Sequence, residues 1–431
     1  MGLIDIIVLV LSFIVMLGIG VPVAWTLGIS GLITILLSVD SLASFTTIAQ
    51  QVATSLDSFT LLAIPLFILA GQIMNKGGIA RRLIDFAKNV VGSLPGGLAY
   101  VNIFAAMLFG AIAGSSVAAA SAIGSILGPR MEKEGYSKEF SAAVNITSST
   151  TGLVIPPSNI LIVYSLASGG ASIAALFVAG YIPGILTGLF LMLVAAVWAK
   201  RKQFPVGERA AIRDVGRSFL SAFPSLLLLV IVIGGIVAGI FTATEAAGIA
   251  VVYTLGLAWY YDEINLKDLP DVFLGSVATT AIVMLLVATS ISMSWVMSFE
   301  NIPQDISRLL LSLSESKIII LLMINLILLF VGIFMDMTPA VLIFTPIFLP
   351  IVTELGVDPI HFGIIMVLNL CIGICTPPVG TVLFVGIRVA KTTIEKVIRP
   401  LLPLYIAMLI ALLLVTFVPE LSLWLPRLFG L

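Results

Sequence analysis

One pattern occurs twice in this 431-residue chain: a long apolar stretch with a small polar tip, then an apolar segment interrupted by two consecutive prolines. The residues that punctuate the two copies lie 221 positions apart: Pro129 and Pro350, Gly135 and Gly356, Gly152 and Gly373, Pro156-Pro157 and Pro377-Pro378. The tips, Gly114-Ser115-Ser116 and Asp336-Met337-Thr338, follow this spacing to within one residue. A shared register of this kind indicates an internal duplication, as in many transporters.

The amino-acid composition indicates whether the two copies fold in water or in a membrane. Hydrophobic residues make up 60% of the chain, charged residues only 10%, and the mean hydropathy is +1.21. These values exclude an ordinary soluble domain and predict a polytopic membrane protein. The first apolar run, residues 3–20, contains Asp5 and has no basic residue before it. We therefore expect it to be a membrane span and not a secretory signal.

Two apolar runs have the wrong length for a single span. Segments 96–127 and 318–351 have 32 and 34 residues, but each half is only about 24 Å long as a helix, against a hydrocarbon core of about 30 Å. We predict that each is a re-entrant hairpin, whose irregular tip must be enclosed by protein or face water. A discontinuous helix should follow each hairpin, at 139–165 and at 361–386.

The basic residues predict the orientation. If the N-terminus is periplasmic, 18 of the 21 Lys and Arg residues fall in internal segments, as the positive-inside rule requires. The expected domains are a first repeat at 1–199, a basic cytoplasmic linker at 200–217 and a second repeat at 218–431, inserted in opposite directions. The expected fold class is thus an all-α polytopic membrane protein with two inverted repeats, each containing a re-entrant hairpin and a discontinuous helix.

The residues at the breaks in these helices are the candidates for binding a ligand. Thr338-Pro339 and Thr376-Pro377 have the pattern of a helix N-cap followed by proline at the first helical position. A helix that restarts in mid-membrane directs unpaired N–H groups and partial positive charge at an anion, whereas the carbonyl groups freed on the other side suit Na⁺. The alternative is a proline kink whose hydroxyls bond back to their own helix. The pairing of two breaks with two hairpins favours a site.

Asp336 is the one acidic residue expected near the bilayer centre, where ionisable side chains are rare and usually functional. It is expected to coordinate a cation, to take up a proton or to cap the second hairpin limb, and the sequence leaves these three roles open. The chain has one histidine and no phosphate-binding loop, so it lacks the parts for ATP-driven transport or metal-dependent hydrolysis. An ion gradient should supply the energy, with no cofactor beyond the coupling ion.

At these motifs the chain resembles a known family. GLVIPPSN at 152–159, GICTPPVGT at 373–381, GSSVAAASAIG at 114–124 and FTLLAIPLFILAGQIM at 59–74 are similar to segments of the large membrane subunit of tripartite ATP-independent periplasmic (TRAP) transporters. The resemblance covers the whole chain. It implies a bacterial inner-membrane protein that imports an organic acid, such as sialic acid or a C4-dicarboxylate, with Na⁺ by an elevator motion. It also implies two partners, a small four-span membrane subunit and a periplasmic solute-binding protein.

The resulting site hypothesis has three parts. The first cation site is expected at Ser115, Ser116, Gly152 and Pro156, and the second at Asp336, Thr338, Gly373 and Thr376. The substrate carboxylate should lie between them, in contact with Ser149, Ser158, Asn159 and Pro378. No Arg or Lys falls near the predicted midplane, so helix dipoles and bound Na⁺ must balance the anion.

Two other classes of function remain. Sodium-coupled dicarboxylate carriers share the hairpin and broken-helix pairs, and a stand-alone symporter of that type would need no binding protein. Their tips carry a Ser-Asn-Thr motif, which both tips of this chain lack. A non-transporting scaffold or an intramembrane enzyme is the other class. We expect no enzyme, because no nucleophile with a basic partner falls at membrane depth.

Overall fold

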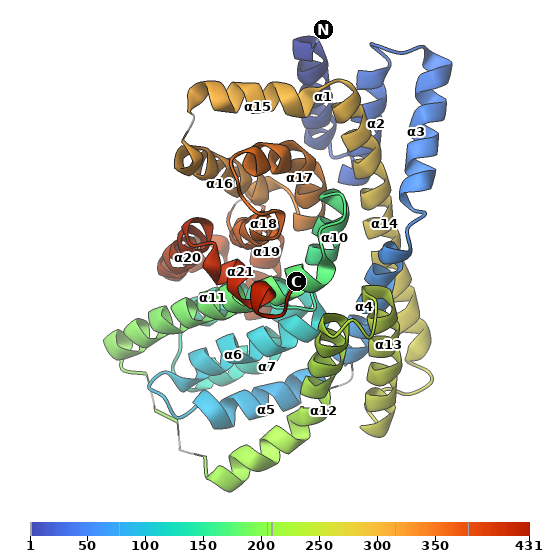
Figure 1. The fold of residues 1–431 in the computed structure, drawn as a ribbon. Coiled ribbons are helices and arrows are strands. Elements are labelled where there is room, and N and C mark those ends of the chain that lie inside the picture. The colour runs from blue at the N-terminus through green and yellow to red at the C-terminus, as the bar shows by residue number, and fades with distance from the viewer. Residues whose placement is uncertain (1, 77, 205, 208–209, 315, 378) are drawn as a thin grey trace.

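The computed structural model describes residues 2–76, 78–204, 206–207, 210–314, 316–377 and 379–431, and helices dominate this part of the chain (Figure 1). The first half contains α1 (Gly2–Gly18), α2 (Val23–Ile35), α3 (Ser41–Ser55), the 3-10 helix η1 (Phe59–Leu62), α4 (Ala63–Lys76), α5 (Ile79–Val91), α6 (Gly97–Ala113), α7 (Ser116–Lys133), α8 (Lys138–Ser149), α9 (Thr151–Val154), α10 (Asn159–Ala167) and α11 (Ile173–Lys202). The second half contains α12 (Ile212–Val237), α13 (Ala243–Tyr260), α14 (Leu269–Phe299), α15 (Ile302–Leu313), α16 (Lys317–Phe334), α17 (Met337–Glu354), α18 (Pro359–Gly373), α19 (Thr381–Ala390), α20 (Ile394–Phe417) and α21 (Glu420–Leu428).

Helix boundaries repeat with the spacing found in the sequence. Three pairs of helices begin 221 residues apart: α7 and α17, α8 and α18, and α11 and α20. The loops before α8 and α18 are also alike, because Gly135 and Gly356 adopt positive φ values of 87° and 70° and the N-caps are Ser137 and Asp358. Glycine suits such a left-handed position because it has no Cβ. The predicted duplication is confirmed as two copies of one helix pattern.

Both predicted hairpins and both interrupted helices are present. The hairpins are α6–α7 and α16–α17, and their second limbs continue past the predicted ends to Lys133 and Glu354. The first interrupted helix comprises α8, α9 and α10 and bends by 51°, while α18 and α19 form the second. Seven of the described helices are long and apolar enough to cross a membrane, including α16 and α17. Their orientation in a bilayer and the domain limits stay predictions.

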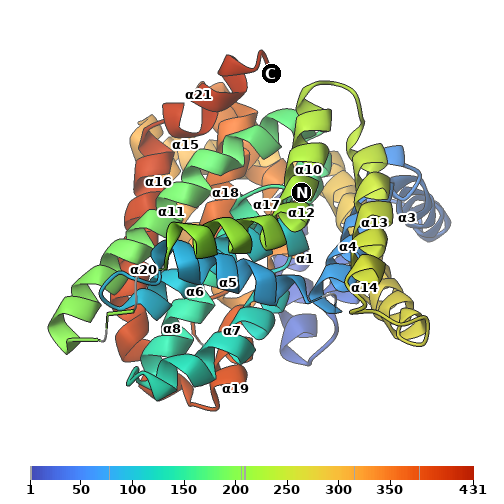
Figure 2. The ribbon, with the colours of Figure 1, turned by 90° about the horizontal axis from the view of Figure 1, so that it is seen from below.

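The helices form two groups (Figures 1 and 2), which touch where α14 packs on α17 and where α4 packs on α6. One group contains α1–α4, α13 and α14, with α14 packed against α2, α3 and α4. The other contains the two hairpins and the interrupted helices, with α11 and α20 packed among them. Helix α5 packs on α6 of the first hairpin, and α15 packs on α17 of the second. The first hairpin thus lies between α11 and the amphipathic helix α5, and the second between α18 and the amphipathic helix α15.

Each hairpin touches its interrupted helix backbone to backbone. A Cβ atom placed on Gly110 of α6 would lie 2.7 Å from the Cα of Gly152 in α9. In the second repeat, a Cβ on Gly332 of α16 would lie 3.0 Å from the Cα of Gly373 in α18. Only glycine allows helices to approach so closely. The two crossings fix the depth at which each break lies against its hairpin.

Buried polar pairs reinforce these crossings. The Ser148 hydroxyl of α8 donates to the Asn102 side-chain oxygen of α6 at 3.1 Å, and both residues are buried. The Asn369 amide of α18 donates to the Asn325 side-chain oxygen of α16 at 2.8 Å. In an apolar interior a polar group needs such a partner, because leaving it unpaired costs about 1–3 kcal/mol. The same pair of elements is therefore joined in the same way in both repeats.

Replacing either crossing glycine by alanine should lower the thermal stability of the protein, and by a larger amount at Gly110 than at Gly332. We expect Gly110→Ala to lower the melting temperature of the detergent-solubilised protein, because the new Cβ overlaps the Gly152 backbone and overpacking costs about 1–3 kcal/mol. Gly332→Ala should do so less, since its Cβ has slightly more room. Gly256→Ala is the control, because nothing lies within 4 Å of its Cβ. Equal melting temperatures for all three variants would contradict the role of the crossings.

Candidate functional site

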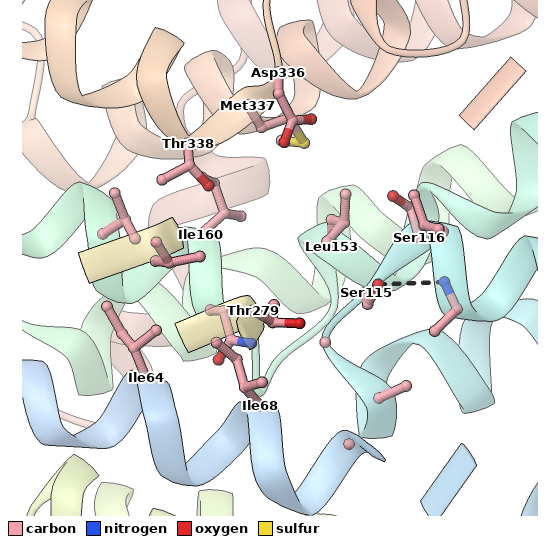
Figure 3. A pocket seen from close by; sticks show the side chains of 18 of the residues that line it. Ile64, Ile68, Ser115, Ser116, Leu153, Ile160, Thr279, Asp336, Met337 and Thr338 are labelled. Atoms are coloured by element: carbon pink, nitrogen blue, oxygen red, sulfur yellow. Dashed lines mark hydrogen bonds between the residues drawn. The ribbon is translucent and has the colours of Figure 1, made fainter. Parts of the chain in front are cut away.

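Four helix N-termini converge on one cavity of about 230 Å³ between the two groups of helices. The first residues of α7, α17, α10 and α19 line it: Ser116, Met337, Asn159 and Thr381. In Figure 3 the two hairpin tips lie on different sides of the cavity, with Ile64 and Ile68 of α4 along its floor. Each N-terminus presents backbone N–H groups and partial positive charge, so the cavity suits an anion.

The first tip is formed by a glycine and a serine with separate roles. Gly114 ends α6 with a φ of 60°, and its N–H donates to the Gly110 carbonyl at 2.8 Å. Ser115 then starts α7 as its N-cap, and its hydroxyl oxygen accepts the Ala118 N–H at 3.3 Å (Figure 3). These are the preferred residues for a helix end and a helix start. The chain therefore reverses here in two residues, with Ser116 facing the same cavity.

The second tip carries the one acidic side chain among the described lining residues. Asp336 occupies the N-cap position of α17, but its side chain makes no capping hydrogen bond. Asp336 lines the cavity, and one of its carboxylate oxygens lies 3.5 Å from the Thr381 hydroxyl at the start of α19. Thr338 of the same tip also lines the cavity. The carboxylate therefore keeps most of its acceptor capacity for a ligand.

At the first break, both predicted serines bond to backbone carbonyls. α9 ends at Val154, the Pro156–Pro157 peptide bond is cis, and α10 begins at Asn159. The Ser158 hydroxyl donates to the Leu153 carbonyl at 2.5 Å, which connects the two sides of the break. Ser149 is fully buried, and its hydroxyl donates to the Ile146 carbonyl at 2.9 Å. Neither serine lines the cavity.

At the second break, a hydroxyl from another helix takes part. α18 ends at Gly373, and the Thr376 hydroxyl donates to the Ile372 carbonyl at 2.7 Å. The Tyr405 hydroxyl of α20 donates to the Cys375 carbonyl. The Tyr405 hydroxyl thus gives the Cys375 carbonyl a partner just beyond the end of α18, whereas the Ile372 carbonyl also accepts the Cys375 N–H at 3.1 Å. The predicted contact at Pro378 lies outside the described residues.

The structure brings together part of the predicted set. Five predicted residues line the cavity: Ser115, Ser116, Asn159, Asp336 and Thr338. Five others lie behind the lining and shape the breaks: Ser149, Gly152, Pro156, Ser158 and Gly373. Thr376 is half-buried and is bonded to its own helix. Binding of a cation or a substrate at any of these positions stays a prediction.

Sequence reasoning missed one wall of the cavity. Gln72 and Asn75 of α4 and Thr279 of α14 line it, and they belong to the helix group that faces the tips. A signal existed, because two amides three residues apart in an otherwise apolar segment share one helix face. Thr381 was also missed, although it stands where α19 restarts.

The described lining of the cavity has few charged side chains. Its described lining contains one carboxylate, Asp336, and no Lys, Arg or His. No cluster of three or more His, Cys, Asp or Glu side chains that suits a metal ion is found among the described residues. A bound anion would therefore depend on backbone N–H groups, hydroxyls, amides and accompanying cations.

Comparisons with known proteins agree with this architecture. Residues 10–421 match the family model described as "Tripartite ATP-independent periplasmic transporter, DctM component". The chain is 57% identical to the uncharacterized protein YgiK of Salmonella typhimurium, over 99% of this chain and 98% of that protein. It is 43% identical to the C4-dicarboxylate TRAP transporter large permease protein DctM of Pseudomonas aeruginosa, over 94% of this chain and 95% of that protein.

A solved structure shares the fold. The crystal structure of the Alcanivorax borkumensis YdaH transporter aligns with a TM-score of 0.66 at 13% sequence identity, covering 90% of each chain. At this identity the likeness extends to the arrangement of helices alone.

The Ser158 hydroxyl should stabilise the first break. We expect Ser158→Ala to lower the free energy of unfolding by about 1–3 kcal/mol, because the buried Leu153 carbonyl loses its hydrogen-bond donor. Thermal unfolding of the purified protein measures the change. Ser125→Ala is the matched control, since this exposed serine bonds only to the Ala122 carbonyl of its own helix. A loss of stability as large in the control as in Ser158→Ala would refute the assignment.

Proposed function

The chain belongs to the DctM family, the large membrane component of tripartite ATP-independent periplasmic transporters, and we propose that it imports an organic acid together with Na⁺. It is a multi-pass protein of the inner membrane and works in transport, as its relatives are named for that activity and for no enzymatic one. Family membership supports the transport of organic acids. Sodium coupling and an elevator motion go beyond the family assignment and are what we propose.

One observation supports the proposal most strongly: four helix N-termini and a carboxylate surround one small cavity without any cationic side chain in its described lining. The N-termini favour a carboxylate ligand. The carboxylate of Asp336 and the carbonyls around the breaks favour a hard cation. An anion and a cation bound together would each offset the charge of the other, which supports the proposal that their transport is coupled.

In the proposed arrangement each hairpin tip holds one Na⁺. The first lies at Ser115 and Ser116, against the break that contains Gly152 and Pro156. The second lies at Asp336 and Thr338, against the break that contains Gly373 and Thr376. Of the three roles considered for Asp336, coordination of a cation fits best, because its side chain makes no capping bond and the residue lines the cavity.

The substrate carboxylate is proposed to lie between the two ions. Asn159 contacts it from the start of α10. Ser149 and Ser158 support this contact from behind by holding the backbone of the first break. Pro378, which lies outside the described residues, stays in the proposed set because of its position in the second sequence repeat.

The two helix groups suggest how the cavity changes sides. We propose that the hairpins and interrupted helices move as one body against the group that contains α4 and α14. A small four-span membrane subunit would complete the static part in the bilayer. A periplasmic solute-binding protein would deliver the acid to the periplasmic side, where we also expect the N-terminus. The family description, which names a tripartite periplasmic system, supports both partners.

Asp336 provides the direct test of the cation site. We expect Asp336→Asn to reduce uptake at least 10-fold at low Na⁺ and to raise the Na⁺ concentration for half-maximal uptake, because a neutral amide holds a cation more weakly than a carboxylate does. Uptake by proteoliposomes with the complete system, measured across a Na⁺ series, gives both values. Asp40→Asn is the matched control, since Asp40 is an exposed N-cap residue of α3 that also makes no capping bond. Unchanged Na⁺ dependence in Asp336→Asn would exclude this site.

The stand-alone symporter is the second candidate, and the shared fold of a solved transporter keeps it open. Omission of the binding protein from the proteoliposomes separates the two. We expect uptake to fall to background without it, because the substrate must be delivered to the membrane subunit. Undiminished Na⁺-driven uptake would establish the symporter instead.

A further inference from the structure

A second cavity lies away from the hairpin tips. It is bounded by the starts of α16 and α18, the end of α20 and α21, and its volume of about 910 Å³ falls within the roughly 300–1,000 Å³ of ligand pockets. We propose that this cavity binds a zwitterionic phospholipid whose headgroup carries a primary ammonium group. The inference goes beyond the proposed function, because neither the transported acid nor Na⁺ takes part in it.

Aromatic rings fill the place in the first repeat that corresponds to this cavity. The rings of Phe140 and Trp198 stack there with their centroids 5.2 Å apart, and Phe140 is only 1% exposed. At the spacing of 221 residues their counterparts are His361 and Pro419, which both line the cavity. Two large rings of the first copy are thus replaced by smaller side chains, which leaves room for a ligand in the second copy.

The end of α20 adds to this difference between the repeats. Helix α11 continues to Lys202, whose counterpart in the second repeat is Leu423. Helix α20 already ends at Phe417, and the chain then turns into α21. Both Phe417 and Leu423 line the cavity. The cavity therefore arises where the second repeat departs from the first in its helix end as well as in its side chains.

A buried imidazole with one unpaired nitrogen lines the cavity. His361 is 2% exposed, and its Nε2 lies 3.4 Å from the Thr416 carbonyl oxygen. Because a carbonyl oxygen only accepts, Nε2 carries the proton and Nδ1 of the neutral ring is an acceptor. Nδ1 is buried and has no hydrogen-bond partner among the described residues. A ligand N–H group would supply the donor that this nitrogen lacks, whereas a phosphate oxygen would not.

The charged side chains of the described lining balance. They are Lys317, Asp358, Glu420 and Arg427, two of each sign. Glu420 and Arg427 pair with each other at 2.7 Å, while the Lys317 ammonium donates to the Gly356 carbonyl at 3.2 Å and keeps two further N–H donors. A phosphate near Lys317 and an ammonium group near Asp358 would complete the balance without adding net charge. The lining therefore suits a zwitterion.

An apolar stripe leads away from the cavity along α16. Ile318, Leu322, Leu326 and Phe330 recur every four residues, which places them on one helix face, and all four are exposed. Ile318 also lines the cavity. Helix α16 is apolar enough to cross a membrane and begins with Lys317, a residue type typical of a membrane surface. Acyl chains joined to a headgroup in the cavity would cover this stripe, so the zwitterion is assigned as a lipid.

Three probes test the assignment on the purified full-length protein in detergent. They are phosphatidylethanolamine, phosphatidylcholine with the same acyl chains, whose ammonium group has no N–H, and soluble phosphoethanolamine. A ligand of the folded state raises the melting temperature, so thermal unfolding across a concentration series gives each affinity. We expect phosphatidylethanolamine to bind about 10-fold more tightly than phosphatidylcholine, and phosphoethanolamine to cause no shift at the same concentrations. Equal affinities of the two lipids, or tighter binding of phosphoethanolamine, would overturn the proposal.

Two substitutions locate the lipid in the cavity. Lys317→Ala should weaken phosphatidylethanolamine binding at least 10-fold, because the phosphate loses a charged donor. His361→Phe introduces the residue of the first repeat and should abolish the preference for phosphatidylethanolamine over phosphatidylcholine. Lys202→Ala is the matched control, since Lys202 is an exposed lysine at the end of α11 outside the cavity. Full phosphatidylethanolamine affinity in Lys317→Ala, an exposed position whose replacement leaves the core intact, would refute the assignment.

A protein partner on this face would give a different result. If Lys317→Ala weakens attachment of the periplasmic binding protein and leaves lipid affinity unchanged, the cavity belongs to a protein interface and the lipid assignment falls. Lipid binding is measured in KCl without an organic acid. Its failure would therefore leave the proposal of sodium-coupled transport untouched.

Discussion

The arrangement depends on one constraint: a helix that ends inside an apolar medium must find partners for its backbone polar groups. At the first tip the Ser115 hydroxyl accepts an N–H group, and at the breaks Ser158 and Tyr405 donate to carbonyl groups. These bonds stabilise interrupted helices in the interior. The first residues of four helices line one cavity, and their N–H groups make it suitable for an anion.

Comparison of the two repeats separates the features that both copies share from the features that differ between them. The glycine crossings at Gly110 and Gly332 are present in both copies, because each hairpin must approach its interrupted helix to the same depth. The tips differ: the first ends in serines and the second in Asp336. Duplication therefore preserved the frame, whereas the two cation sites proposed within it differ in charge.

The sequence was sufficient for the elements and insufficient for the orientation of side chains. Segment length and paired prolines predicted both hairpins and both breaks, because helix geometry and proline sterics act locally. Ser158 shows the limit. A hydroxyl beside a break can face a ligand or bond to a carbonyl, and only the three-dimensional arrangement shows that it bonds to Leu153. Gln72 was not predicted for another reason. It lines the cavity only because α4 lies opposite tips that are distant from it in sequence.

The backbone contact between Gly110 and Gly152, with its counterpart at Gly332 and Gly373, has a mechanical consequence. A hairpin pressed directly on a neighbouring main chain, with no side chains between them to rearrange, has little freedom to swing open like a flap. Each tip and its break form one stiff assembly, so the two helix starts within a repeat keep their distance from each other. In the proposed motion, a ligand bound at a tip would keep the same binding geometry. Its access to either side of the membrane would be controlled by the helix group that contains α4 and α14.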